Sequence, residues 1–491
     1  MIKKLCLTLM CCSAIEAASN LHTLYTTLDP KSVGQALAFY ELYPTSTEGL
    51  EALSRAQQLL QTKMDLRYLA SALNRLQGGH EQLSESELQL IEQLASHFPN
   101  RKLKGYHAKS EEEVLVLQSD QIDLGKALIL SQTSSSDAEQ LARNYSALID
   151  LMALQIAAQL PSTATAEQKI AQINRFLFEQ MHIRFPPHSV FAKEIDRYTF
   201  LASVMDDHLG VCLGVTALYL AIAQRLELPL EIITPPGHIF VRYREGKHVV
   251  NIETTARGVD LPSEVYLGVN TCRLAQRELK EVVGMTHVNQ ASVYLNSGNY
   301  ALAKQSYEKA LPYMPQDLFV TELFAYTCLF EGEEQRGRAL LEKVRHYVPD
   351  HAIGGRVLAD DYLNGKVDLE GIRAVFTLVD ETRESLLKKK TSLEQTLSKC
   401  PEFRDGYLQL GITWIQLNRS KEAIAAFSRY HELNTRDPQA AYYLAVLHGE
   451  RHDYRRSWEY LVEAENLVAE RLFCPRALRE LRDELCANCP P

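Results

Sequence analysis

Several features that assign chains to common functional classes are missing from this sequence. Beyond its first residues, no segment offers the roughly 20 apolar residues that a transmembrane helix needs. Acidic residues outnumber basic ones, 62 to 52, and the formal net charge is −10, so the positive surface typical of nucleic-acid-binding proteins is not expected. The one basic run, Lys388 to Lys390, is interpreted as the solvated face of a helix. The sequence therefore predicts no transmembrane segment in the mature chain and no nucleic-acid partner.

A disulfide framework and a metal-binding motif are also missing. The chain has 10 cysteines, and those beyond the first 12 residues are odd in number and widely scattered, unlike the cysteines of a disulfide-rich domain. Cys486 and Cys489 have the spacing of a redox or metal motif, but no second pair of ligands accompanies them. We therefore expect no zinc site and no cofactor, and we interpret these two residues as part of a C-terminal disulfide with Cys474 nearby.

The first 18 residues have the composition of an export signal. Two lysines precede the apolar run Leu5 to Met10, and small residues follow at 11–14 and 17–18. The apolar run is too short to span a membrane as a mature helix. We expect cleavage near Ala18 and export to the periplasm or cell envelope. The alternative is a short apolar helix at the start of a cytoplasmic protein.

A cysteine at the predicted start of a helix is the first candidate functional residue. Cys212 lies in the sequence Gly-Val-Cys-Leu-Gly, and Leu213 to Leu228 is apolar almost all round, which predicts a helix buried in a domain core. The unpaired N–H groups and the dipole at a helix amino terminus favour an anion, so they would increase the thiolate fraction and could hold a developing oxyanion. The alternative is a buried, inert cysteine.

A histidine and an acid follow on two predicted strands, 238–243 and 248–253. With a two-residue loop at Glu245–Gly246, the hairpin sets His238 directly opposite Glu253. Opposed Cβ atoms lie about 4.5–5.5 Å apart, so we expect a hydrogen bond between these side chains. Asn251, the alternative partner, would lie one pair away. The predicted core face carries Ile239, Val241, Tyr243, Val250 and Ile252.

A thiol, an imidazole and a carboxylate in this order are typical of a nucleophile with its base and orienting group. The segments that carry them, within residues 196–258, include Pro-Gly-His at 236–238 and Val-Asn-Ile-Glu-Thr-Thr-Ala-Arg-Gly at 250–258. They resemble the transglutaminase-like superfamily, and more narrowly its SirB-type bacterial branch, in which such a core is joined to tetratricopeptide repeats. The resemblance implies a papain-like fold, with Cys212 as nucleophile, His238 as base and Glu253 at a position where the family has aspartate.

The superfamily transfers acyl groups through a thioester, in amide cleavage, deamidation or amide crosslinking. The resemblance therefore implies a peptidase-like or amidase-like thiol enzyme acting on a peptide or protein. We favour water as the acyl acceptor because no amine site is evident in the sequence. Two alternatives stay open: a non-catalytic binding or scaffold protein built on a degenerate core, and a protein transglutaminase or deamidase.

Small and aromatic residues recur with a period of 34 residues after Gly284. The period and the residue types resemble tetratricopeptide repeats. Stacked repeats present a concave surface for a peptide or a partner's helix, so we expect a protein partner there. The alternative is that the repeats only support the core. The leading small residues of the four units are Ala291, Ala325, Gly411 and Ala445.

With 491 residues and 46% apolar content, the chain can build about two to four domains. We predict an α+β multidomain protein, in which a papain-like core is flanked by a helical amino-terminal region and an α-solenoid. The predicted boundaries are 1–18 for the signal peptide, 20–105 for the helical region, 106–284 for the transglutaminase-like domain, 285–350 for repeats one and two, 351–402 for an irregular helical segment, 403–471 for repeats three and four, and 472–491 for the tail.

Overall fold

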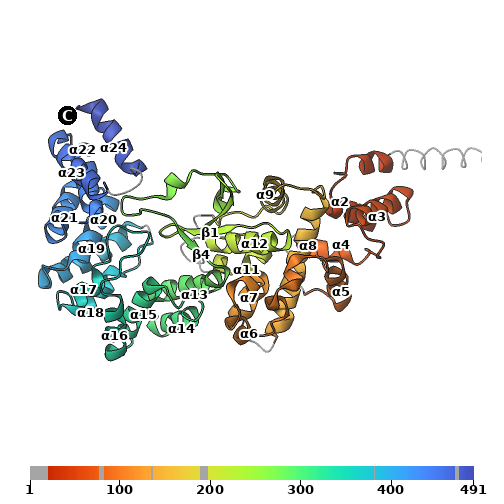
Figure 1. Cartoon of the computed structure of the whole chain (residues 1–491), viewed down its shortest axis with the longest axis horizontal. Coiled ribbons are helices and arrows are strands. Elements are labelled where there is room, and N and C mark those ends of the chain that lie inside the picture. Colours follow the sequence, from red (N-terminus) through yellow and green to blue (C-terminus); the bar gives the residue numbers. More distant parts are fainter. Residues whose placement is uncertain are drawn as a thin grey trace, which may run out of the picture.

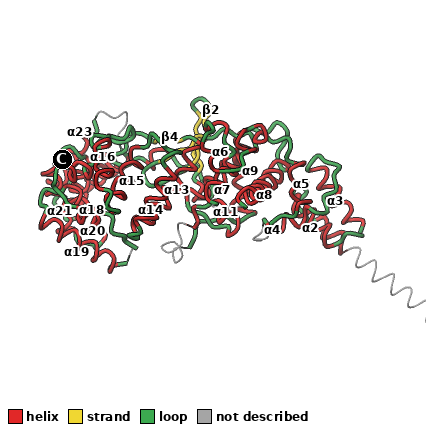
Figure 2. Tube along the Cα trace, turned by 90° about the horizontal axis from the view of Figure 1, so that it is seen from below, coloured by secondary structure: helices red, strands yellow, loops and turns green. Residues whose placement is uncertain are grey.

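A computed structural model describes residues 20–76, 82–133, 137–187, 197–380, 382–469 and 475–490. The predicted signal peptide and Cys474 lie outside these residues. The described chain is elongated: amino-terminal helices occupy one end, the strands lie near the middle, and carboxy-terminal helices form the other end (Figure 1). Helices predominate, and the strands are confined to the central part (Figure 2). Within the described ranges, no helix is long and apolar enough to cross a membrane.

Three helices of the amino-terminal end begin at serines that cap them. Ser32, Ser46 and Ser84 each accept a hydrogen bond from the backbone N–H three residues further on, which satisfies a group that the helix start leaves unpaired. Ser84 forms a full capping box with Glu87. The helices of this end are α2 (Val33–Leu42), α3 (Thr47–Leu59), α4 (Leu69–Arg75) and α5 (Glu85–Leu94).

The central domain is built around α12 (Cys212–Arg225). Every residue after Cys212 in this helix is buried except Gln224, because α7, α8, α11 and β2 all pack on it. The helix begins where the sequence predicts and ends before Leu228, since Glu227 adopts a left-handed φ of +52°. The neighbouring helices are α6 (Glu111–Leu115), α7 (Leu124–Gln132), α8 (Ala138–Ala158), α9 (Ala166–Asn174) and α11 (Leu201–Asp207).

A four-stranded antiparallel sheet with the order β3-β2-β1-β4 completes this domain. One face of β2 is covered by α12, so a helix that begins at a cysteine packs on a sheet. The α+β fold class is therefore confirmed. The strands are β1 (Glu231–Thr234), β2 (Phe240–Glu245), β3 (His248–Ile252) and β4 (Ala275–Arg277).

The predicted register of the β2–β3 hairpin is wrong by two residues. Val241 pairs with Ile252, and the two-residue turn is Gly246–Lys247 rather than Glu245–Gly246. Gly246 has a φ of +58°, which suits the first position of a tight hairpin turn and favours glycine there. A shift of two keeps each side chain on its predicted face. Ile239, Val241 and Ile252 accordingly remain buried in the core.

Helices in consecutive pairs form the carboxy-terminal part. The predicted small residues lie where the two helices of a pair meet: a Cβ atom on Gly411 would lie 2.7 Å from the ring of Phe427. The pairs are α13 (Leu279–Asn296) with α14 (Tyr300–Ala310), α15 (Leu318–Phe330) with α16 (Glu334–Val344), α20 (Arg404–Gln416) with α21 (Ser420–Leu433), and α22 (Pro438–Glu450) with α23 (Tyr454–Leu467). The helices between and after them are α17 (Leu358–Leu363), α18 (Leu369–Val375), α19 (Arg383–Lys399) and α24 (Arg476–Asn488).

The predicted C-terminal disulfide is wrong for Cys486 and Cys489, because both are free thiols. Cys486 lies in α24, and Cys489 still donates from its backbone N to Leu485 O at 2.8 Å. Cβ atoms three residues apart on a helix are about 5–6 Å apart, which is more than the roughly 3.5–4.5 Å of a disulfide. Helical geometry therefore keeps the two sulfur atoms apart.

Candidate active site

Cys212 is the first residue of α12, where the N–H groups of the helix are unpaired. The glycines that flank it are required by close packing. A Cβ atom on Gly214 would lie 2.4 Å from the carbonyl oxygen of Tyr198, and one on Gly210 would lie 2.5 Å from Cγ2 of Val215. The Cys212 side chain itself is only half-buried. The Gly-Val-Cys-Leu-Gly sequence thus presents an accessible thiol at a tightly packed helix start.

Backbone hydrogen bonds fix the approach to this thiol. Gly210 N donates to Arg184 O at 3.0 Å, and Val211 N donates to Tyr198 O at 3.1 Å. Both acceptors lie in segments that precede α12 and are not part of it. The position of Cys212 is therefore set by tertiary contacts as well as by its helix.

His238 enters the site through a proline-rich turn. Gly237 has a φ of +72°, a conformation that glycine adopts without strain, and His238 N donates to Pro235 O at 3.1 Å. The imidazole Nε2 of His238 lies 2.6 Å from Oε2 of Glu253. The predicted contact between these two side chains is therefore present, because the two-residue shift of register leaves both on the same face.

Glu253 is buried, and both of its carboxylate oxygens accept hydrogen bonds. Oε1 accepts from the backbone N of Thr255 at 3.1 Å and from its hydroxyl at 2.6 Å. Oε2 accepts from His238 and from the Tyr266 hydroxyl, the latter at 2.8 Å. Burial raises the pKa of Glu253, but the hydrogen bonds from His238, Thr255 and Tyr266 outweigh it and lower the pKa below its usual value. The carboxylate is thus held charged and in one orientation.

The protonation of His238 is set by its two partners. Burial by itself lowers the pKa of His238, but hydrogen bonds to Cys212 and Glu253, together with the negative charges of those groups, raise the pKa to about 9. At neutral pH the imidazole is therefore protonated, with its Nε2 facing the carboxylate of Glu253. A cysteine that interacts with a protonated histidine is the arrangement typical of a thiol nucleophile.

Tyr266 is a further residue of the site that sequence reasoning missed. Its hydroxyl donates to Glu253, and its ring stacks on His238 with centroids 5.9 Å apart and on Phe240 with centroids 4.3 Å apart. Tyr266 lies in a 3₁₀ turn, Ser263–Tyr266, beyond the hairpin. No motif or periodicity marks it, because only the folding of this loop brings it back over the histidine.

A pair of buried threonines joins the nucleophile helix to the acid. Thr216, one turn after Cys212, has its Oγ1 2.9 Å from Oγ1 of Thr254, the residue after Glu253. Both threonines are almost fully buried. The contact therefore couples the start of α12 to the segment that holds the carboxylate.

Asn251, the alternative orienting residue, has a structural role. Its Oδ1 accepts from Arg242 Nε at 2.8 Å, and its Nδ2 donates to Leu261 O at 2.6 Å. These bonds hold the loop after β3 against β2. The orienting contact to His238 is made by Glu253.

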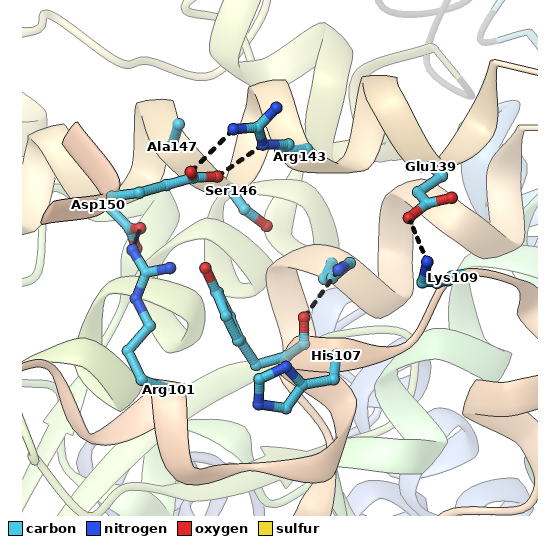
Figure 3. A pocket seen from close by; sticks show the side chains of 11 residues that line it. Arg101, His107, Lys109, Glu139, Arg143, Ser146, Ala147 and Asp150 are labelled. Atoms are coloured by element: carbon cyan, nitrogen blue, oxygen red, sulfur yellow. Dashed lines mark hydrogen bonds and ion pairs between the residues drawn. The ribbon is translucent and has the colours of Figure 1, made fainter. Parts of the chain in front are cut away.

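A cavity of about 210 Å³ lies among charged side chains of α5, α7, α8 and the turns between them (Figure 3). None of the three candidate residues lines it. Its Arg and Lys side chains already contact groups of the protein itself, namely Arg101 with Asp150, Lys109 with Glu139, Lys126 with the carbonyl of Tyr106, and Arg143 with Glu85 and Glu92. We therefore interpret this cavity as part of an ion-pair network. Across the described ranges, no three His, Cys, Asp or Glu residues are grouped closely enough to hold a metal ion.

Comparison with known families supports the interpretation of the central part. Residues 143–281 match the family described as Transglutaminase-like superfamily, and residues 286–313 match the Tetratricopeptide repeat. The chain contains a transglutaminase-like domain. This domain includes Cys212, His238 and Glu253, and the repeat match covers most of α13 and α14. The resemblance to the superfamily and the presence of a tetratricopeptide repeat are therefore confirmed.

Similar solved structures cover only part of the chain. "MamA MSR-1 C2" has 17% identity and a TM-score of 0.19, over 38% of this chain and 95% of that chain. "MamA 41-end from Desulfovibrio magneticus RS-1" has 14% identity and a TM-score of 0.20, over 39% and 97%. Similarity at these TM-scores carries no conclusion about the transglutaminase-like domain. No curated protein matches the chain significantly.

Proposed function

We propose that the transglutaminase-like domain is a cysteine-dependent acyl-transfer enzyme that hydrolyses an amide bond of a peptide or protein. The observation that carries this proposal is the position of His238, whose Nε2 lies 2.6 Å from Oε2 of Glu253 and whose pKa is raised by Cys212 as well as by Glu253. These contacts supply a nucleophile, a proton-transfer group and an orienting carboxylate in one cluster.

In the first step the Cys212 thiolate attacks the carbonyl carbon of the substrate. Negative charge develops on the carbonyl oxygen, and the unpaired N–H groups at the start of α12 are suited to stabilise it. His238 donates its proton to the leaving nitrogen as the C–N bond breaks. The products of this step are a free amine and a thioester on Cys212.

In the second step neutral His238 accepts a proton from water, which attacks the thioester. The product leaves as a carboxylic acid, which gives its remaining proton to solvent, while Cys212 returns as a thiolate and His238 is again an imidazolium. Glu253 holds the ring throughout and stabilises its positive charge. An amine in place of water would make the reaction a transglutamination, and a glutamine side chain as substrate would make it a deamidation.

The first test is the rate of iodoacetamide labelling of each thiol against pH, measured by peptide mass spectrometry. Cys486 is an exposed free thiol of the same chain and serves as the internal reference, while Cys328 is the buried one. We expect Cys212 to react at pH 6–7 at least tenfold faster than Cys486, and to lose this advantage in His238→Ala. Equal or slower labelling of Cys212 in the wild type would contradict the proposal and favour a binding protein with a degenerate core.

The remaining features of the chain complete this proposal. We place the domain in the SirB-type branch because it is followed directly by a tetratricopeptide repeat, and we assign the repeats to a protein partner. The basic and apolar composition of residues 1–18 supports export. An exported enzyme would act on peptides of the cell envelope. A reporter fused after residue 18, compared with the same fusion lacking residues 2–18, tests the location.

A further inference from the structure

A groove of about 460 Å³ lies beside the candidate active site. One wall is Pro236 with the loop 265–271 of the transglutaminase-like domain, and the other is formed by Gln439, Tyr442, Tyr443 and Ala477 of α22 and α24. We call it the tyrosine groove. Its size is that of a small-ligand site, although its walls come from opposite ends of the carboxy-terminal half (Figure 1).

One ion pair joins α24 to the residue next to the first wall, and backbone hydrogen bonds hold the loop of that wall in place. Arg479 of α24 forms an ion pair with Glu264, next to the loop that makes the first wall. Cys272 N donates to His351 O at 2.7 Å, and Ile353 N donates to Asn270 O at 3.2 Å. These bonds tie the same loop to the segment between the repeats. Binding of a ligand in the groove would therefore cost little conformational entropy of this loop, because the loop is already ordered by folding.

Tyr266 connects the groove to the catalytic centre. It lines the groove, and it also donates to Glu253 and stacks on the His238 ring. Pro236, two residues before His238, is a second lining residue and is exposed. A peptide bound in the groove would thus be separated from the imidazole of His238 by the ring of Tyr266. This is where residues that flank a reacting carbonyl would bind.

The chemistry of the lining defines the occupant. None of the lining residues is charged, so a charged side chain would lose its hydration without gaining an ionic partner. Three tyrosines supply flat apolar faces with a polar tip, and Val265, Leu267 and Val269 add aliphatic surface. The Oδ1 of Asn270 accepts from Gly354 N at 3.1 Å, which leaves its Nδ2 and the carboxamide of Gln439 as groups that suit a peptide backbone.

We propose that the tyrosine groove binds the peptide substrate, taking an uncharged aromatic or large aliphatic side chain close to the amide bond that Cys212 attacks. This inference rests on the proposed acyl-transfer function for the position of that bond. It assigns the last repeat a part in substrate selection, and it makes the full chain, rather than the transglutaminase-like domain alone, the unit of recognition.

The test measures peptide binding by isothermal titration calorimetry with the full chain carrying Cys212→Ser, which excludes turnover. The probes are two acetylated and amidated pentapeptides, Ala-Ala-Phe-Ala-Ala and Ala-Ala-Lys-Ala-Ala. We expect the phenylalanine peptide to bind at least tenfold more tightly than the lysine peptide. In the same background, Ala477→Glu places a negative charge in the groove from α24, which disfavours the phenylalanine ring and gives lysine an ionic partner, so it should remove this preference.

Ala487→Glu is the matched control, because Ala487 is exposed on the same helix and does not line the groove. It should retain the tenfold preference and the melting temperature. Gln439→Glu introduces the same charge from α22 and provides a second variant if Ala477→Glu unfolds. Preference lost in either folded groove variant and kept in Ala487→Glu supports the groove.

Equal binding of the two peptides to the Cys212→Ser chain, or a preference that both folded groove variants retain, would overturn the inference. So would binding of N,N′-diacetylchitobiose, but not of the phenylalanine peptide, because the occupant would then be a glycan. Hydrolysis of 4-nitrophenyl acetate by the wild type, compared with Cys212→Ser, separately tests the acyl-transfer proposal. Peptide selectivity without thiol-dependent hydrolysis would leave the groove as a binding site and reject the enzyme.

Discussion

His238 and Glu253 share a hydrogen bond of 2.6 Å between Nε2 and Oε2, and the carboxylate that accepts it is buried. Glu253 also accepts from Tyr266 and Thr255, so its orientation is fixed from both sides. Glutamate has a longer side chain than the aspartate of the family pattern, but its carboxylate is still within hydrogen-bonding distance of the imidazole.

Replacing Glu253 with glutamine tests the role of this charge. The amide is similar in shape but neutral, so the burial of His238 would no longer be opposed by a carboxylate and the pKa of the imidazole should fall from about 9. NMR titration of the ring protons measures this fall. Thiol-dependent hydrolysis should decrease by roughly 10²–10⁴-fold, the range of general acid–base groups. An unchanged titration would show that Cys212 alone sets the protonation of His238.

The pKa of His238 predicts a limit to activity at alkaline pH. The leaving nitrogen needs the imidazolium proton, so kcat/KM should fall as pH rises through about 9. The profile of 4-nitrophenyl acetate hydrolysis does not need this proton and serves as a comparison with an amide substrate. An amide profile that is flat to pH 10 would contradict proton donation by His238.

The same ionisation predicts a pH dependence of stability. The folded pKa of His238, about 9, is above its ordinary value of 6.5. Its contribution to the free energy of unfolding is therefore complete below about pH 6.5 and is lost as pH rises through about 9. Urea unfolding at pH 6 and pH 9.5 should show a larger decrease for the wild type than for His238→Ala. Equal decreases would place the folded pKa near 6.5.

Tyr266→Phe tests the contribution of the Tyr266 hydroxyl separately from that of its ring. The variant keeps the stacking on His238 but removes the bond to Glu253, and a hydrogen bond to a charged group contributes about 1.5–3 kcal/mol. We expect a loss of this size in the free energy of unfolding together with reduced hydrolysis. Tyr243→Phe is the matched control, because its hydroxyl donates to the exposed Glu245 at 3.0 Å. It should leave hydrolysis unchanged.

Gly214→Ala tests the packing at the start of α12. Its Cβ atom would lie 2.4 Å from the carbonyl oxygen of Tyr198, so the helix start must move, at a cost of about 1–3 kcal/mol. Iodoacetamide labelling of Cys212 should change as well, because the thiol moves with the helix. Gly354→Ala is the control: its Cβ atom would have Asn270 Oδ1 at 3.9 Å as its nearest neighbour. Similar urea midpoints for the two variants would contradict this account.

Much of the candidate site could be predicted from local patterns. The apolar run after Cys212 determines a buried helix, and two glycines allow its start to pack closely. Alternation along the two strands determines that His238 and Glu253 share a face. The prediction of a shared face is correct even though the register is wrong by two residues, because side chains alternate with a period of two. The 34-residue period determines the helix pairs in the same way, since small residues must lie where helices meet.

Other features were decided only by the tertiary structure. The turn position depends on which residue adopts a positive φ, and Gly246 decides it within the folded hairpin. Tyr266 and the tyrosine groove depend on loops and on α22 and α24, which meet only after the repeats have curved back to the sheet. By itself, then, the sequence determined the helix, the strand faces and the repeats, because these follow from short-range periodicity. The tertiary structure decided the contact of Tyr266 with Glu253 and the groove, because contacts between distant segments leave no period in the chain.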